Sequence, residues 1–257
     1  HNVIILDPGC RMVNKNNMNT IDEADLWEAI KSVKKHFNID TTRIYLRGAC
    51  LSSRDAMRLA VKYPDKFAAL SITAPETVIS KINNPWLQHN EPLNFLQNIK
   101  HLPILNIHSK IDPHSPIDVS IKLNKAIQKY NFKRYTYREL SMEFKTYYSE
   151  EYLEDIYKFF IKHSTIHNTK EVDFSTNQLK YNRAFWITLN SITASKTSHI
   201  KAVIDNNNNL TIEKENVESY TIDLKRLPYN KTVPLTIVDN KEKIYEGIPK
   251  EDHLTFS

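Results

Sequence analysis

Residues 43–65 constrain the fold of this chain more than any other segment. Their sequence is RIYLRGACLSSRDAMRLAVKYPD. It predicts an apolar strand at residues 44–46, a tight turn at residues 48–52, and a helix whose apolar side chains share one face. Such a strand, turn and helix form a nucleophile elbow, in which the middle residue of G-x-S-x-G stands above the carboxyl edge of a parallel sheet. Here Cys50 is the middle residue, and Ser52 replaces the second glycine.

The residues around this elbow alternate between strand-like and helix-like patterns. We expect strands at residues 3–6, 44–46, 67–72, 103–108 and 133–138. We expect helices at residues 23–37, 93–99, 117–130 and 150–163, and another after the tight turn, with its apolar face at residues 56–61. Short connections between alternating elements predict a mostly parallel sheet with helices on both faces.

The pattern changes near residue 165. Short segments rich in β-branched and aromatic residues follow, separated by turn residues, at 172–174, 184–189, 200–204, 210–213, 220–223 and 233–238. This pattern predicts a small all-β domain. We therefore expect an α/β domain at residues 1–164 and a β-rich domain at residues 165–257, joined through the polar stretch 163–170.

Composition argues against several function classes. Lys and Arg number 35 and Asp and Glu number 30, and the two signs are interspersed, so we expect no nucleic-acid partner. No apolar run reaches the roughly 18 residues of a membrane span. The two cysteines, Cys10 and Cys50, lack a C-x-x-C spacing, and the ten histidines form no metal-binding pattern. We expect no disulfide framework, no metal and no cofactor.

Several motifs together resemble the α/β-hydrolases of the prolyl-oligopeptidase-like and feruloyl or acetyl esterase-like type. They are DPGCR at residues 7–11, EADL at 23–26, IDTTRIYL at 39–46, AVKYPDKFAA at 60–69 and PILNIHSKID at 103–112. Residues 172–187 resemble the β-rich extension that some of these hydrolases carry. The resemblance implies an α/β-hydrolase-type sheet, and a hydrolase of ester or peptide bonds.

Catalysis in that family needs a nucleophile, an acid and a histidine. The resemblance places the nucleophile at Cys50 and the acid at Asp112, which would orient the histidine. The histidine position falls on Met142 or Glu143, and residues 139–145 contain no histidine. A carboxylate at Glu143 would raise the thiol pKa rather than lower it.

Two interpretations of function follow. In the first, the triad is degenerate and the protein is weakly active or inactive, because the histidine is missing and Ser52 and Ser53 replace glycines that relieve crowding at the turn. In the second, Cys50 is the nucleophile of an active hydrolase, with a base from His114 or from outside this chain. Cys50 can also be read simply as a small buried apolar residue at a strand end.

Other candidates have structural interpretations. Ser52 and Ser53 can cap the helix, His108 can be a structural residue at a strand end, and His114 can be a solvated loop residue. Glu23 and Asp25 can complement the helix dipole. Asn209 and Asn230 begin N-x-T sequons, which recur by chance. The aromatic residues Tyr181, Phe185 and Trp186 suit either a carbohydrate-binding surface or a strand core.

The resemblance also predicts something outside the sequence. In the family, another strand lies between residues 3–6 and the elbow strand, and it precedes an oxyanion-hole N–H. We therefore expect an upstream segment of the same protein to complete the sheet. Family resemblance suggests an exported bacterial protein, periplasmic or extracellular, that takes a small-molecule, ester or peptide ligand.

Overall fold

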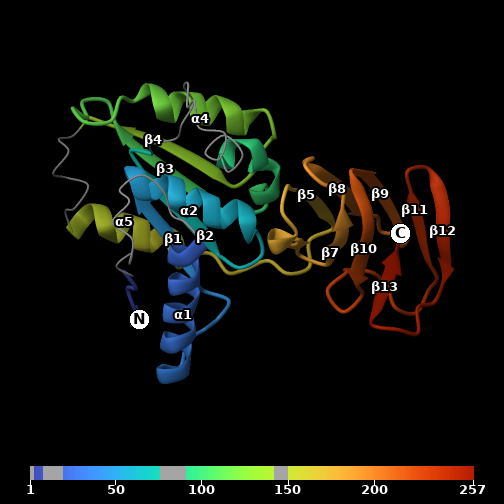
Figure 1. The fold of residues 1–257 in the computed structure, drawn as a ribbon. Helices are drawn as coiled ribbons and strands as arrows, with labels where there is room; N and C mark the ends of the chain where they lie inside the picture. The colour runs from blue at the N-terminus through green and yellow to red at the C-terminus, as the bar shows by residue number, and fades with distance from the viewer. Residues whose placement is uncertain (1–2, 8–19, 76–90, 142–149) are drawn as a thin grey trace.

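The computed structural model describes residues 3–7, 20–75, 91–141 and 150–257. Its first half is a parallel sheet flanked by helices, and its second half is all-β (Figure 1). The first half contains α1 (Thr20–His36), β1 (Tyr45–Ala49), α2 (Leu51–Lys62), β2 (Ala69–Thr73), the 3₁₀ helix η1 (Pro92–Ile99), β3 (Ile104–Ser109), α4 (Asp118–Gln128), β4 (Tyr135–Leu140) and α5 (Glu150–Phe160). No helix within the described ranges combines the length and the apolar character needed to cross a bilayer.

The parallel sheet has the order β1-β2-β3-β4, and every neighbouring pair is parallel. All residues of β2 and β3 are buried, because helices cover both faces. On one face, Leu105 and Ile107 pack against Tyr152 and Ile156 of α5. On the other face, the sheet packs against α2, η1 and α4. The mixed α/β class predicted from the sequence is confirmed.

The expected strand at residues 3–6 is wrong. Val3, Ile4, Ile5 and Leu6 have no regular secondary structure and are 39–88% exposed. A strand needs a neighbour with which to exchange backbone hydrogen bonds. In the described residues the sheet ends at β1, and this segment does not pair with it.

The second half folds into two sheets around one apolar core. Its strands are β5 (Glu171–Thr176), β6 (Arg183–Ala184), β7 (Ile187–Ile192), β8 (Ser198–Ile204), β9 (Asn209–Glu215), β10 (Val217–Asp223), β11 (Leu235–Asp239), β12 (Glu242–Gly247) and β13 (His253–Phe256), with the 3₁₀ turn η3 (Leu179–Tyr181) between β5 and β6. The sheet orders are β13-β10-β7-β6 and β12-β11-β9-β8-β5. The second half is all-β, as the sequence predicted. Strands β12 and β13 were not among the segments predicted from the sequence.

Asn98 of η1 joins the two halves. Its Nδ2 donates to Val61 O of α2 at 2.8 Å and to Ser175 O of β5 at 2.9 Å, while its Oδ1 accepts from Ser175 N at 2.8 Å. Asn98 is 3% exposed, so these bonds satisfy backbone groups that water does not reach. One amide side chain thus connects α2, η1 and β5.

Candidate functional site

The turn after β1 is an elbow with a strained residue at its tip. Cys50 has φ 53° and ψ −124°, and its N–H donates to Thr73 O at the end of β2 at 2.9 Å. A non-glycine residue in such a conformation costs about 1–3 kcal/mol and persists where its surroundings impose it. Cys50 is exposed, so its interpretation as a small buried apolar residue is wrong.

Gly48 allows α2 to approach β1 closely. A Cβ atom at this position would lie 2.4 Å from Ser52 O and 2.6 Å from Ser53 Cα. Both contacts are with backbone atoms, which cannot turn away as a side chain can. Glycine is therefore required here for the close approach rather than for its backbone conformation.

Ser52 and Ser53 brace the turn with their hydroxyl groups. Ser52 Oγ accepts from Ala49 N and donates to Ala49 O, both at 2.8 Å. Ser53 is fully buried, and its Oγ donates to Thr73 O at 3.2 Å. None of these three bonds caps α2, because the backbone groups that take part belong to the ends of β1 and β2. The serines at the glycine positions therefore add hydrogen bonds to the elbow.

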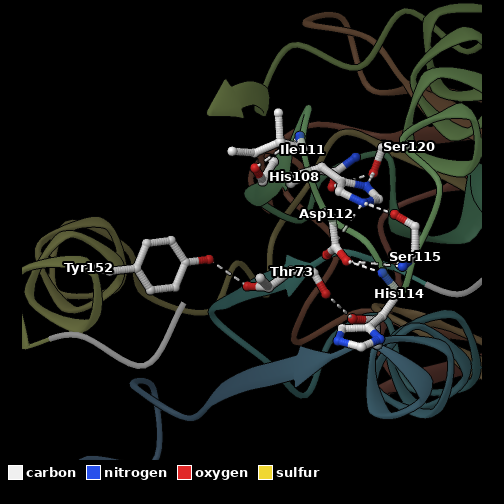
Figure 2. A network of polar contacts seen from close by, with 11 residues as sticks. Thr73, His108, Ile111, Asp112, His114, Ser115, Ser120 and Tyr152 are labelled. Atoms are coloured by element: carbon white, nitrogen blue, oxygen red, sulfur yellow. Dashed lines mark hydrogen bonds and ion pairs between the residues drawn. The ribbon is translucent and has the colours of Figure 1, made fainter. Parts of the chain in front are cut away.

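Thr73 also connects the elbow to α5, as Figure 2 shows. Its Oγ1 lies 2.6 Å from the hydroxyl oxygen of Tyr152 in a buried hydrogen bond. Burial is the main cause that raises the pKa of Tyr152, so the phenol stays protonated. Sequence reasoning missed this pair, because a tyrosine on the apolar face of a helix has the same pattern as a packing residue.

Asp112 lies in the loop after β3, and its side chain is fully buried. Its Oδ1 accepts from the backbone N–H groups of His114 at 2.8 Å and Ser115 at 3.0 Å. Its Oδ2 has no hydrogen-bond partner in the part of the chain that the structure describes, and lies 3.9 Å from Nε2 of His108 (Figure 2). One carboxylate oxygen therefore shapes the loop, and the other is unused.

His108 has the structural role expected of it. It is fully buried, with Nδ1 2.8 Å from Ser120 Oγ and Nε2 2.9 Å from Ser115 O. Burial lowers its pKa, against the raising effects of the Ser115 hydrogen bond and the Asp112 charge. Its neutral ring ties the loop after β3 to α4.

The described residues do not join Asp112 to Cys50. Cys50 Sγ makes no hydrogen bond among them, and Asp112 accepts none from an imidazole. His114 is exposed on the same loop as Asp112. Cys10, Met142 and Glu143 lie outside the described residues. In the described part of the chain, no group of three His, Cys, Asp or Glu side chains could hold a metal ion.

Glu23, in the first turn of α1, has contacts beyond the expected interaction with the helix dipole. It is 3% exposed, and its carboxylate accepts hydrogen bonds from Tyr63 at 2.7 Å and Tyr181 at 2.8 Å. Lys180 and Lys62 lie 3.0 Å and 3.6 Å from it. Since Tyr181 is 158 positions away, no local sequence signal could have revealed this contact.

The aromatic residues proposed for carbohydrate binding are core residues. Tyr181, Phe185 and Trp186 are 5%, 3% and 1% exposed. The indole N–H of Trp186 donates to Thr169 O at 2.8 Å. No carbohydrate could stack on these rings, so the core interpretation is the right one.

Three solved structures illustrate what the chain is similar to. A thermostable esterase matches with 22% identity and a TM-score of 0.41, over 55% of this chain and 36% of its own. Pyrococcus horikoshii acylaminoacyl peptidase matches with 20% identity and a TM-score of 0.43, over 55% of this chain and 27% of its own. Staphylococcus aureus S-formylglutathione hydrolase matches with 13% identity and a TM-score of 0.44, over 54% of this chain and 60% of its own. This chain therefore spans less than two thirds of each, and the likeness concerns the fold alone. No protein-family model and no curated protein sequence matches the chain.

Proposed function

We propose that this chain is an α/β-hydrolase-type protein with an incomplete triad, which binds an ester- or peptide-like ligand at the elbow and hydrolyses it weakly or not at all. Cys50 stands at the nucleophile position and Asp112 at the acid position. The proposal includes a domain boundary between residues 164 and 165, with the elbow in the first domain.

The observation that carries this proposal is the state of the Asp112 carboxylate. An acid that orients a catalytic histidine holds the imidazole N–H with one oxygen. Here Oδ1 accepts two loop N–H groups, and Oδ2 has no partner. The His108 ring, with Nε2 3.9 Å from Oδ2, is buried and uses both nitrogens elsewhere. Loss of one triad member typically costs about 10⁴ to 10⁶ in rate.

An active thiol hydrolase is the second candidate, and one observation favours it. Cys50 is exposed on a strained turn at the start of α2, whose first turn carries no acidic residue. A helix N-terminus stabilises a thiolate, which is the reactive form of cysteine. In this candidate, a base from outside the described residues takes the thiol proton.

Thiol labelling separates the two candidates. Iodoacetamide–fluorophore labelling would be timed for the unmodified protein, Cys50→Ala and Cys10→Ala, with hydrolysis of p-nitrophenyl acetate measured in parallel. The Cys10→Ala variant leaves Cys50 as the single thiol. We expect Cys50 to react no faster than a free cysteine, and ester turnover to be the same in all three proteins. Fast labelling that disappears in Cys50→Ala, together with Cys50-dependent turnover, would refute the incomplete-triad proposal.

A further inference from the structure

Buried polar groups form a connected cluster beneath the Asp112 loop. His108 and Asn106 of β3 and Ser120 of α4 are fully buried. His108 Nδ1 lies 2.8 Å from Ser120 Oγ, and Ser120 Oγ lies 3.4 Å from Asn106 Oδ1. Asn106 Nδ2 donates to the Tyr135 hydroxyl at 2.9 Å. The cluster ends at the unpartnered Oδ2 of Asp112, 3.9 Å from His108 Nε2.

The neutral form of His108 leaves part of this cluster unused. Ser115 O can only accept, so Nε2 must carry the proton that it receives at 2.9 Å. In a neutral ring Nδ1 is then the acceptor, and the hydroxyl proton of Ser120 is directed to it. The same proton cannot also serve Asn106 Oδ1. Asp112 Oδ2 remains a buried carboxylate oxygen without a donor, which is costly.

The protonated form gives each polar atom between His108 and Asn106 a partner. Nδ1–H would donate to Ser120 Oγ, whose own proton would then turn to Asn106 Oδ1. The positive ring would face Asp112 Oδ2, which needs to move by less than about 1 Å to reach hydrogen-bond distance. The proton added at Nδ1 therefore accounts for the long 3.4 Å contact, and the positive charge that it brings to the ring attracts the unpartnered oxygen.

We propose that His108 is a proton-uptake site that controls the loop after β3. A proton from water converts the ring to imidazolium, and the ring then draws the Asp112 carboxylate away from the N–H groups of His114 and Ser115. The loop thus has two arrangements, selected by pH. This proposal does not depend on whether Cys50 is reactive.

Few charged groups face His108. The carboxylate of Asp112, in the loop after β3, is the charge that raises the pKa of His108. Glu139 of β4 lies opposite His108 in the ladder and is paired with Lys110 at 3.3 Å. From α4 the facing group is the uncharged Ser120, and on the same face β2 presents the apolar Ile72. Burial opposes proton uptake and Asp112 favours it, so uptake belongs to the acidic range below the ordinary histidine value.

The test is an NMR titration of the whole chain. The imidazole Cε1–H signal of His108 and the backbone amide signals of His114 and Ser115 would be followed from pH 7.5 to pH 4. We expect the ring and both amides to shift with one common midpoint. In Asp112→Asn the midpoint should move to lower pH, because the amide keeps an acceptor for the loop N–H groups but removes the charge. Asp118→Asn, at the exposed start of α4, is the matched control and should leave the midpoint unchanged.

A second variant keeps the proposal testable if Asp112→Asn does not fold. His108→Gln retains one donor and one acceptor but cannot take up a proton. The component of the His114 and Ser115 amide shifts that has the His108 midpoint should disappear, whereas a shift caused by the His114 ring itself should remain. The proposal is overturned if His108 stays neutral until the protein unfolds, if its midpoint is the same in Asp112→Asn, or if the loop amides shift unchanged in His108→Gln.

Discussion

Replacing Glu23 with alanine should destabilise the protein far more than the removal of an ordinary helix charge. The Glu23 carboxylate is 4% exposed and receives two phenol hydrogen bonds, from Tyr63 and Tyr181. Lys62, 20% exposed, and Lys180, 47% exposed, contribute positive charge beside it. Glu23→Ala therefore removes from α1 the common acceptor of groups at the end of α2 and in η3.

The size of the effect follows from burial. A hydrogen bond to a charged group contributes about 1.5–3 kcal/mol, and a buried ion pair that loses one partner costs about 3–5 kcal/mol. Lys180 is too exposed to add much. Tyr63 is only partly buried, so its phenol can bond to water once the carboxylate is gone, which limits the sum. We expect a loss of about 3–5 kcal/mol in the free energy of unfolding.

Urea unfolding, followed by tryptophan fluorescence and by far-ultraviolet circular dichroism, measures this loss. Glu154→Ala is the matched control, because Glu154 pairs with Lys158 at 3.0 Å in an exposed i,i+4 geometry. Such a pair contributes about 0.3–0.5 kcal/mol. If Glu23→Ala and Glu154→Ala lowered the free energy of unfolding by the same amount, burial of Glu23 would not stabilise the fold as argued.

The pH dependence of Glu23→Gln gives an independent check. Burial acts to raise the pKa of Glu23, but hydrogen bonds from Tyr63, Lys180 and Tyr181 lower it below the ordinary 4.5. A carboxylate with a lowered pKa in the folded state stabilises the fold above its unfolded pKa, and this contribution is lost as pH falls through the folded value. The stability difference between the unmodified protein and Glu23→Gln should be constant above about pH 5.5 and shrink below pH 4.5. A difference that grew on acidification would contradict this reasoning.

Two further substitutions test the elbow and the β core. Gly48→Ala should cost at least about 2 kcal/mol in thermal unfolding, because its Cβ would meet Ser52 O at 2.4 Å; a change under 0.5 kcal/mol would show that α2 can shift. Trp186→Phe should cost about 2–4 kcal/mol in urea unfolding, since it leaves Thr169 O unpaired and opens a cavity at a residue 1% exposed. An unchanged urea midpoint would argue against a packed core at Trp186.

The fold was largely predictable because its signals are local. The strand, turn and helix at residues 43–65 predicted β1, the elbow and α2, and alternation along the chain predicted a mostly parallel sheet. β12 was missed because EKIYEG is polar and mostly exposed, so it lacks the apolar alternation of a buried strand. The strand expected at residues 3–6 was wrong because the segment is apolar but has no neighbouring strand among the described residues with which to pair.

The candidate site was less predictable because its side chains act on distant groups. The sequence identified Cys50 and Asp112 but could not show that Asp112 is bonded to its own loop. It also could not show that Tyr152 reaches Thr73, 79 positions away. For Tyr152 and Thr73 the separation along the chain limited the prediction, whereas for Asp112 the limit was the unknown conformation of its loop.

The bonds of Asn98 restrict how this protein can change in evolution. The N–H and C=O of Ser175, in the first β5 strand of the β half, both end on one amide supplied by η1. If recombination moved the β half to another protein without η1, the N–H and C=O of Ser175 would lose their hydrogen bonds to Asn98. We therefore expect the β half to lose stability when it is separated from η1.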